Sequence, residues 1–442
     1  MALTSREQAV CAEIGRRRGA LVELACDLIR FDTTARNVGD PPRDEAALQR
    51  RLAERLAAAG ADCDLWEPSA DEMARRPLVP PGLDYHGRPQ LVARFGGEGD
   101  GRALLFNGHI DVVSAEPRER WTSDPFDPEL RDGALYGRGS CDMKGGIAAM
   151  VVAAEVLSSL GVHLAGDLVV ATNTDEESSG AGSSAIVRRG IRADAGIVTE
   201  PTGFDVWVAC RGSEYGVVRV PGRPGHAEMR QPPWRHGGAV NAIEKATVVI
   251  DAMRRLRAAW ATREGLDHPH LSRPDLLPTL ASAGEWAVTY PAGCDLTIAV
   301  LYLLEQADRD GWGSAIRREV EEWLVRETAH DDWLAEHPPA IEWWPNSVMP
   351  LEIPEGEPIV GVTLEATRDV GAPGGASGLD SWYDGAAFTL LADIPSVAYG
   401  PSGFRAGGVS VAHTIDEHVP VDDLVTCAQG LAVTAMRFCG AT

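Results

Sequence analysis

The sequence predicts an α/β protein with two domains: a mainly parallel sheet with helices on both faces, and an inserted α+β domain. Between residues 5 and 209, short apolar runs bounded by turn residues alternate with longer segments of helical periodicity. That alternation is typical of a parallel sheet covered on both faces. After about Cys210 the pattern changes to strand, helix, strand, helix, and sheet-like runs return after Pro354. We therefore expect a first domain over residues 1–209 and 353–442 and an inserted domain over 210–352, which a chain of 442 residues can accommodate.

Each predicted element of the first domain rests on its local pattern. Apolar residues at helical spacing predict helices over residues 5–30, 44–59, 147–160 and 183–189, and Gly60 ends the second of them. Short apolar runs between turn residues predict strands over residues 63–66, 91–95, 103–106, 167–172 and 195–198. Asp132-Gly133 predicts the turn of a hairpin over residues 130–136.

The inserted domain and the return to the first domain are predicted in the same way. Alternating side chains predict strands over residues 212–220 and 296–302, and helical spacing predicts helices over 241–258 and 314–327. Sheet residues resume after about Pro354, and two short runs, residues 389–391 and 397–399, are predicted as strands that rejoin the first sheet.

Composition argues against several classes of function. A net charge of −24 and a pI near 4.8 are unfavourable for binding nucleic acid or an anionic membrane. The 8 Cys residues include no C-x-x-C pair, so neither a disulfide framework nor a zinc ribbon is indicated. No apolar run reaches the roughly 18 residues of a membrane span. Glu23 and Asp27 interrupt the apolar stretch near the N-terminus, so we expect a cytoplasmic protein without a secretory leader.

The chemistry is concentrated where the strands are predicted to end. Residues 103–106 are followed by Asn107-Gly108-His109-Ile110-Asp111, so a His and an Asp two residues apart point to the same side. Asp142 precedes a predicted helix, at the edge of the sheet where open α/β folds place their ligands. Further acids and a second His follow at Asp175-Glu176-Glu177, Glu200 and His413. This mixed set of nitrogen and oxygen donors suits zinc and, less selectively, cobalt or manganese.

Each of these residues also has an ordinary structural interpretation. A His after a strand is often a satisfied structural group, an Asp before a helix is often an N-cap, and consecutive acids usually form a charged loop. For Glu200 the alternative is an N-cap-like acid before Pro201, and for His413 it is a surface-loop His, with His418 as a nearby rival. The combination and the order of the residues favour a metal site.

With these motifs in this order, the chain resembles the M20 metallopeptidase family, the group of acetylornithine deacetylase, succinyl-diaminopimelate desuccinylase, aminoacylase and glutamate carboxypeptidase. The resemblance extends from about Val22 to the C-terminus and implies two divalent metal ions. In the implied ligand set His109 and Glu200 bind one ion, Glu177 and His413 bind the other, and Asp142 bridges both. Glu176 matches the general base. Asp111 matches the acid that accepts the imidazole N–H of His109 and fixes its tautomer.

The resemblance also assigns a role to the inserted domain, which in the family forms a lid or dimerisation domain. His226, in Gly225-His226, matches a lid His that reaches into the partner subunit's site and stabilises the oxyanion, the alternative being an exposed turn His. Asn241 matches a lid Asn that contacts the substrate, or is the N-cap of the helix that follows. A homodimer through this domain is therefore expected.

One position departs from the family pattern. Relatives carry Asp-x-Arg-x-x-Pro on a lid strand, and the Arg clamps the carboxylate of the substrate. Here residues 300–305 read Val-Leu-Tyr-Leu-Leu-Glu, with Tyr302 in place of the Arg. Either the substrate lacks that carboxylate or another cation binds it, for which Arg211, Arg230 and Arg405 are available.

These observations predict a zinc-dependent hydrolase of linear amide bonds that deacylates an N-acyl amino acid or a related small amide, in the manner of acetylornithine deacetylase. The sequence leaves three alternatives open. They are a dipeptidase or carboxypeptidase, a biosynthetic enzyme that cleaves or forms an unusual amide, and a catalytically silent relative that binds a ligand. The complete ligand set together with Glu176 argues against the last of these.

Overall fold

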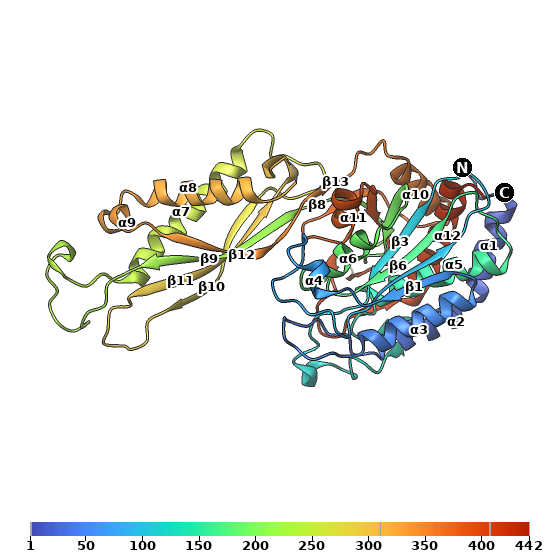
Figure 1. Ribbon diagram of the computed structural model, residues 1–442, viewed down its shortest axis with the longest axis horizontal. Coiled ribbons are helices and arrows are strands. Elements are labelled where there is room, and N and C mark those ends of the chain that lie inside the picture. Colours follow the sequence, from blue (N-terminus) through green and yellow to red (C-terminus); the bar gives the residue numbers. More distant parts are fainter. Residues whose placement is uncertain (1, 310, 406–407, 442) are drawn as a thin grey trace. The chain divides into compact units, whose positions relative to one another are not determined.

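A computed structural model describes residues 2–309, 311–405 and 408–441 of the chain (Figure 1). The chain divides into two compact units: unit 1 comprises Met1–Ala209, Leu351–Gly378 and Tyr383–Thr442, and unit 2 comprises Cys210–Pro350 and Leu379–Trp382. Leu351 and Glu352, expected in the inserted domain, lie in unit 1 because they form a strand of its sheet. Residues 379–382 instead join unit 2, where the Asp380 carboxylate accepts the Ser272 amide N–H at 2.7 Å.

Unit 1 is built on a nine-stranded sheet whose centre is parallel. Strands β6 (Leu168–Asn173), β3 (Leu104–His109), β7 (Ala195–Val198) and β15 (Ser396–Ala398) run parallel in that order. Antiparallel β2 (Gln90–Phe95) and β1 (Asp62–Trp66) extend one edge. The other edge continues with β8 (Val206–Cys210), which is antiparallel to β15, and then β13 (Leu351–Glu352), while β14 (Ala376–Leu379) also pairs with β8. Strands β3 and β6 are buried along their whole length, as central strands covered on both faces should be.

Helices cover both faces of this sheet, which confirms the predicted α/β class (Figure 1). On one face α5 (Lys144–Ser159) and α12 (Val421–Cys439) pack on each other and on β3, and α1 (Ser5–Arg16), α2 (Arg18–Ile29) and α10 (Pro358–Asp369) pack against these two helices. On the other face α6 (Ala181–Arg189) contacts β2 and β6, and α11 (Gly385–Ala392) contacts β7 and β15. Leu105, Val169, Ile186 and Phe388 join these two helices to the sheet in one apolar cluster. Helix α3 (Glu45–Ala58) packs on β1 and β2.

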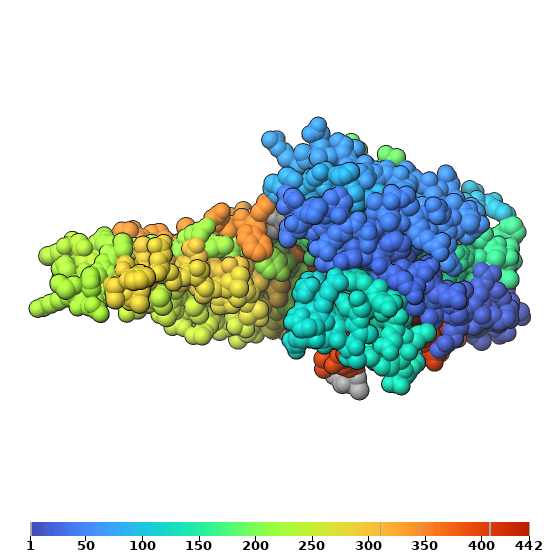
Figure 2. Space-filling view, turned by 90° about the horizontal axis from the view of Figure 1, so that it is seen from below, coloured from blue at the N-terminus to red at the C-terminus, as the bar shows by residue number. Residues whose placement is uncertain are grey.

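Short elements complete unit 1. Helix α4 (Ala70–Met73) lies in the irregular segment between β1 and β2. Strands β4 (Glu129–Arg131) and β5 (Ala134–Tyr136) form the predicted hairpin, and β18 (His418–Pro420) pairs with β5. Strands β16 (Phe404–Arg405) and β17 (Val409–Ser410) pair with each other. The first hundred residues, blue in Figure 2, form much of the surface of unit 1 on the side shown.

Unit 2 is an α+β unit with its own core. Its four antiparallel strands follow the order β10 (Asp275–Ala283), β11 (Gly293–Tyr302), β9 (Gly212–Pro221) and β12 (Ala340–Val348). Helices α7 (Ala242–Thr262) and α8 (Ser314–Thr328) pack together, α7 lies on β9, β10 and β11, and the short α9 (Asp332–Glu336) contacts α8. Val218, Leu256, Leu296 and Val320 belong to the buried apolar cluster of this unit. None of the helices that the structure describes is long and apolar enough to span a bilayer.

Some elements differ from their predictions. The helix predicted over residues 5–30 is two helices, because Arg17 leaves the helical region with φ −87° and ψ 12°. Residues 389–391 lie in α11 and not in a strand, since a run of three residues is too short to show a period and the burial of Phe388 decides its conformation. The sequence patterns missed β10 and β12. Both are edge strands and contain Pro278 and Pro345, which only edges tolerate.

Candidate metal centre

The predicted metal ligands lie where the central parallel strands of the unit 1 sheet end, at the edge formed by their carboxyl ends. His109 is the last residue of β3, Glu177 follows β6, and Glu200 follows β7. Because these three strands are parallel neighbours, their carboxyl ends bring the three side chains to the same edge. Asp142 lies in the turn before α5, and His413 lies in the loop between β17 and β18. The fold thus brings together five residues that are spread over much of the chain.

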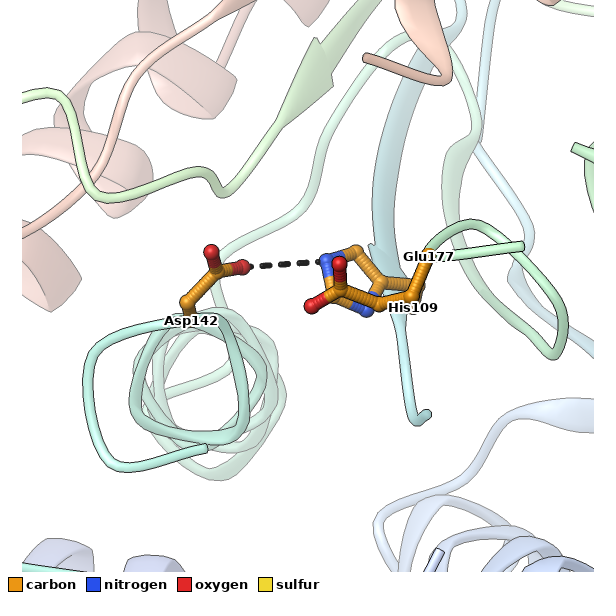
Figure 3. A group of neighbouring side chains, drawn as sticks. All are labelled: His109, Asp142 and Glu177. Carbon is orange, nitrogen blue, oxygen red and sulfur yellow. Dashed lines mark hydrogen bonds and ion pairs between the residues drawn. The ribbon is translucent and has the colours of Figure 1, made fainter. Parts of the chain in front are cut away.

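Asp142 lies between the two His side chains. Its Oδ1 atom is 3.2 Å from His109 Nε2, and its Oδ2 atom is 3.4 Å from His413 Nε2. Glu200 Oε1 lies 3.9 Å from His109 Nε2, and Glu177 Oε2 lies 3.1 Å from His413 Nε2. In Figure 3 the carboxylates of Asp142 and Glu177 lie beside the His109 ring, and ligand atoms of these three residues are within 4.8 Å of one another. A carboxylate that faces one imidazole with each oxygen is placed as a bridging ligand would be.

The side chains present fit divalent cations. Glu200 is 5% exposed, and its Oε1 atom has no hydrogen-bond partner among the described residues. Buried carboxylate oxygens are normally hydrogen-bonded or bound to a metal, so a cation next to His109 would account for this oxygen. The donor set of imidazole nitrogens and carboxylate oxygens is one that zinc, cobalt and manganese accept.

The concentration of buried acids shifts the ionisation of the whole group. Burial, partly offset by the charge of His109, raises the pKa of Glu176 and of Glu200 well above their usual range. Burial acts in the same direction on Asp142, but hydrogen bonds with His109 and His413 outweigh it and hold the pKa of Asp142 below its usual range. Hydrogen bonds to Asp142 and Glu177 raise the pKa of His413 to about 10. The acids therefore attract positive charge to this point, as a cation site must.

The main chain holds His109 from its far side. Its Nδ1 atom lies 2.9 Å from the carbonyl oxygen of Asp111, which can only accept, so Nδ1 carries a proton and Nε2 is the nitrogen that faces Asp142. The Asp111 carboxylate, expected to accept this proton, lies farther away, at 3.7 Å. It accepts the amide N–H groups of Glu176 and Glu177 instead, at 3.2 and 3.1 Å. Asp111 therefore orients both the imidazole and the loop that carries these two acids.

A buried ion pair that the sequence patterns did not reveal holds Asp142. The Glu417 carboxylate accepts the amide N–H groups of Cys141 and Asp142, at 3.0 and 3.1 Å. Its other oxygen lies 2.6 Å from Nη1 of Arg138, and the side chains of Arg138 and Glu417 are 2% and 1% exposed. In the sequence Glu417 is only an acid four residues after His413, and no local pattern connects it to Asp142.

The loops at this edge adopt unusual backbone conformations. Asp175 and His413 have φ angles of 66° and 61°, in the left-handed region that side chains other than Gly rarely adopt. Gly400 lets its loop approach Glu200 closely, since a Cβ atom there would be 2.0 Å from the Glu200 carbonyl oxygen. Such conformations persist only where the surrounding structure holds them, and they cluster at functional sites.

Two further predicted site residues lie in unit 2. Asn241 is the N-cap of α7, because its Oδ1 atom accepts the Ile243 amide N–H at 3.0 Å. His226 is exposed and forms an isolated bridge with Thr289. Its Nδ1 atom accepts the Glu228 amide N–H at 3.3 Å, so Nε2 carries the proton. The substrate contact of Asn241 and the oxyanion contact of His226 stay predictions.

Arg211 and Tyr302 are both engaged by the backbone of unit 2. Arg211 is 7% exposed, and its guanidinium donates to the carbonyl oxygen of Asp380 at 2.8 and 3.0 Å and to that of Arg273 at 3.2 Å. Tyr302 is fully buried, and its hydroxyl donates to the Val348 carbonyl oxygen at 3.2 Å. These contacts give both side chains a structural role within their unit.

Both the sequence and the fold resemble those of known proteins. The profile of peptidase family M20/M25/M40 matches residues 105–437. The N-formyl-4-amino-5-aminomethyl-2-methylpyrimidine deformylase of Bacillus subtilis (strain 168) is 26% identical over 436 residues, which cover 93% of this chain and 93% of the relative. The succinyl-diaminopimelate desuccinylase of Methylibium petroleiphilum is 39% identical over 193 residues, covering 41% of this chain and 47% of the relative. A tripeptidase from Staphylococcus aureus has the same fold, with a TM-score of 0.71 at 19% identity over 96% of this chain and 98% of that one.

Proposed function

The chain belongs to peptidase family M20/M25/M40, and we propose that it removes a small acyl group from the nitrogen of an N-acylated amine or amino acid. Its general class follows from its relatives: it is a metal-dependent amide hydrolase. The observation that carries the proposal is the position of Asp142, whose two oxygens face His109 and His413, with Glu176 beside them.

Five residues would hold two divalent cations, with zinc as the first choice and cobalt or manganese as alternatives. His109 and Glu200 would bind one ion, Glu177 and His413 the other, and Asp142 would bridge them. When bound, the ions supply Lewis acidity toward the amide carbonyl and lower the pKa of water toward neutrality.

Glu176 is the proposed general base. Its Oε2 atom lies 4.0 Å from His109 Nε2, so its carboxylate adjoins the ligands without being counted among them. The Glu176 amide N–H donates to the Asp111 carboxylate at 3.2 Å, and this hydrogen bond fixes the main chain of Glu176. A carboxylate held there takes a proton from the attacking water and delivers it to the leaving amine nitrogen.

We infer that the substrate is a small N-acylated amine that does not bind through a carboxylate at the Tyr302 position. In the family that the sequence resembles, an Arg at this position clamps a carboxylate, whereas Tyr302 is buried and bonded to the Val348 carbonyl. The Arg211 guanidinium is likewise bonded to main-chain carbonyls, so the proposed substrate contacts do not include it. The relative that matches 93% of its own length is named for an N-formyl aminomethylpyrimidine, while the desuccinylase matches only 47% of its own.

We further propose that the protein is a homodimer in which His226 serves the site of the partner subunit. The supporting observation is the tautomer of His226, whose protonated Nε2 is suited to donate to an oxyanion. Mixing a His226→Ala variant with a Glu176→Gln variant tests this arrangement. In a mixed dimer one site would combine an intact Glu176 with an intact His226, so activity should return. No recovery after subunit exchange, or an active monomer, would contradict it.

Amine release is the experiment that tests the proposed function. The protein is stripped with a chelator, reloaded with zinc, cobalt or manganese, and incubated with N-formyl and N-acetyl amines, N-acyl amino acids and dipeptides. We expect metal-dependent release from the acylated amines, identified by mass spectrometry. Release from dipeptides alone would replace a deacylase by a dipeptidase, and a metal-loaded protein that hydrolyses none of them would contradict the proposal.

A further inference from the structure

The loop after β6 carries the two acids with the most direct proposed roles, Glu176 and Glu177. One side of this loop is already accounted for, since the Asp111 carboxylate accepts both of their amide N–H groups. The preceding residue, Asp175, holds the other side. Its carbonyl oxygen accepts the amides of Ser179 and Gly180 at 3.0 and 2.7 Å, which closes the loop into a compact turn.

Asp175 forms a buried ion pair with Arg88, a residue just before β2. Nη1 of Arg88 contacts Oδ1 of Asp175, and the two side chains are 3% and 1% exposed. Nη2 of Arg88 lies 3.4 Å from the carbonyl oxygens of Arg36 and Asn37, so the main chain also anchors the guanidinium. At this depth the pair is little screened by solvent, and its geometry is fixed by its surroundings.

Side-chain hydrogen bonds extend the same contact to Thr174. The Gln90 side chain accepts the Thr174 amide N–H at 3.1 Å and donates to the Thr174 hydroxyl at 2.9 Å. That hydroxyl in turn donates to Oδ2 of Asp175 at 2.6 Å. Gln90 also donates to the Arg88 carbonyl at 2.9 Å. The start of β2 and the start of the loop after β6 therefore belong to one buried hydrogen-bond network.

The conformation of Asp175 shows what this network has to hold. Its φ angle is 66°, a left-handed conformation that Asp adopts only occasionally and as a single residue, with its side chain hydrogen-bonded locally. The residues that follow it are the proposed base and a proposed metal ligand, so the direction in which the chain leaves Asp175 sets where their carboxylates lie. A residue that fixes the conformation of Asp175 therefore influences the positions of these two carboxylates indirectly.

We propose that Arg88 is a positioning residue for the metal centre. By pairing with Asp175 it holds the left-handed turn, and that turn directs Glu177 to His413 and Glu176 toward His109. The inference rests on the proposed function, because it gives Arg88 a task only if these acids bind metal and accept a proton. It adds to the parts that the reaction needs a buried Arg side chain that acts through Asp175.

The test compares Arg88→Met and Arg88→Lys with a control variant, Arg437→Met. Arg437 also pairs with an acid inside unit 1, Glu7, with side chains 14% and 5% exposed. It lies near the end of α12, where the Cys439 carbonyl accepts the amide of Gly166 just before β6, at the edge of the sheet opposite the ligands. Arg437→Met should therefore lower stability without reaching the site.

For each variant the affinity of the metal-free protein for cobalt is measured by titration against a competing chelator, together with the visible cobalt spectrum, the melting temperature, kcat and KM. We expect Arg88→Met to weaken cobalt binding by about 10–100-fold and to lower kcat with little change in KM, because residues that orient ligands have effects of this size. Arg88→Lys keeps the charge but loses the planar fork and should fall between Arg88→Met and the wild type.

Two results would overturn the inference: cobalt affinity and kcat unchanged in Arg88→Met, or losses no larger than those of Arg437→Met at the same drop in melting temperature. If Arg88→Met does not fold, Arg88→Lys decides, and wild-type cobalt affinity in that variant would also overturn it. Failure of the proposed function looks different, since the wild type itself would then neither bind cobalt nor hydrolyse an amide.

Discussion

The two His residues of the candidate metal centre are held in different ways. His109 ends a central strand, its side chain is 1% exposed, and its Nδ1–H is bonded to the Asp111 carbonyl. The His413 side chain is 54% exposed and belongs to a loop in which His413 itself has a left-handed φ of 61°. Both imidazoles face the same carboxylate, that of Asp142. One side of the centre is thus part of the sheet, and the other side is supplied by a surface loop.

This difference implies that the two proposed metal positions would not be equivalent. A ligand fixed by a strand and a second hydrogen bond loses little freedom when it binds a cation. A ligand on an exposed loop must be ordered at the same time, which reduces affinity. We therefore expect the position at His109 and Glu200 to fill first and the position at His413 and Glu177 to exchange more readily.

The largest loss of activity should come from removing His109, the ligand fixed by the sheet. In a His109→Ala variant the tight position is lost and Asp142 has no partner on that side, so we expect kcat/KM to fall by about 10⁴-fold, the loss of several kcal/mol of Lewis-acid stabilisation. Metal analysis after gel filtration should find both positions depleted. Retention of a full metal complement would show that His109 is not a ligand.

A variant that leaves both sides intact separates binding from chemistry. Glu176→Gln keeps the size of the side chain and the amide that Asp111 holds, but it cannot accept a proton. We expect wild-type metal content and a kcat lower by about 10²–10⁴-fold, the usual contribution of a general base. An equal loss of metal and of activity would instead identify Glu176 as a ligand.

Removing His413, the ligand on the surface loop, should cause a smaller and reversible loss of activity. His413→Ala leaves Asp142 and Glu177 in place, so we expect one metal to remain bound and activity to fall by about 10–100-fold, with recovery at high metal concentration. His418 is the matched control, because it is bonded to the Asp416 carbonyl at 2.8 Å and stacks on Tyr136. If His418→Ala lost the metal and His413→Ala did not, the two residues would have been assigned the wrong way round.

The asymmetry also separates what the sequence predicts from what it does not. His109, Glu177 and Glu200 could be singled out because each follows an apolar run, and parallel strands bring such positions to one edge. These are local patterns combined with a general rule of the fold. The prediction that His413 lies beside the other ligands rests on the resemblance to a family, because nothing in the sequence of an exposed loop indicates where the loop will lie.

The residues that orient the ligands could not be predicted in this way. Glu417 contacts Arg138, and Arg88 contacts Asp175, across sequence separations of 279 and 87 residues. Neither pair has a local pattern, since a buried Arg and a solvent-exposed Arg look the same in a sequence. The sequence predicts that the Asp111 carboxylate binds the imidazole, but the Asp111 carbonyl oxygen does so and the carboxylate holds the loop. Which atom of a residue makes the contact depends on side-chain packing that periodicity does not encode.

The smallest change in kcat/KM is expected for variants of Asn241, and these variants serve as the reference for the others. Its side chain caps α7, so Asn241→Ala should cost about 1 kcal/mol of stability, and Asn241→Asp, which can still cap, should restore most of it. If capping is its whole role, kcat/KM stays at the wild-type value in both variants, measured alongside thermal unfolding. That result would define how far a loss of stability alone changes activity, and the effects at His109 and His413 would be read above that level. A fall in kcat/KM in both variants, with stability restored by Asp, would instead give Asn241 the substrate contact that the sequence predicts.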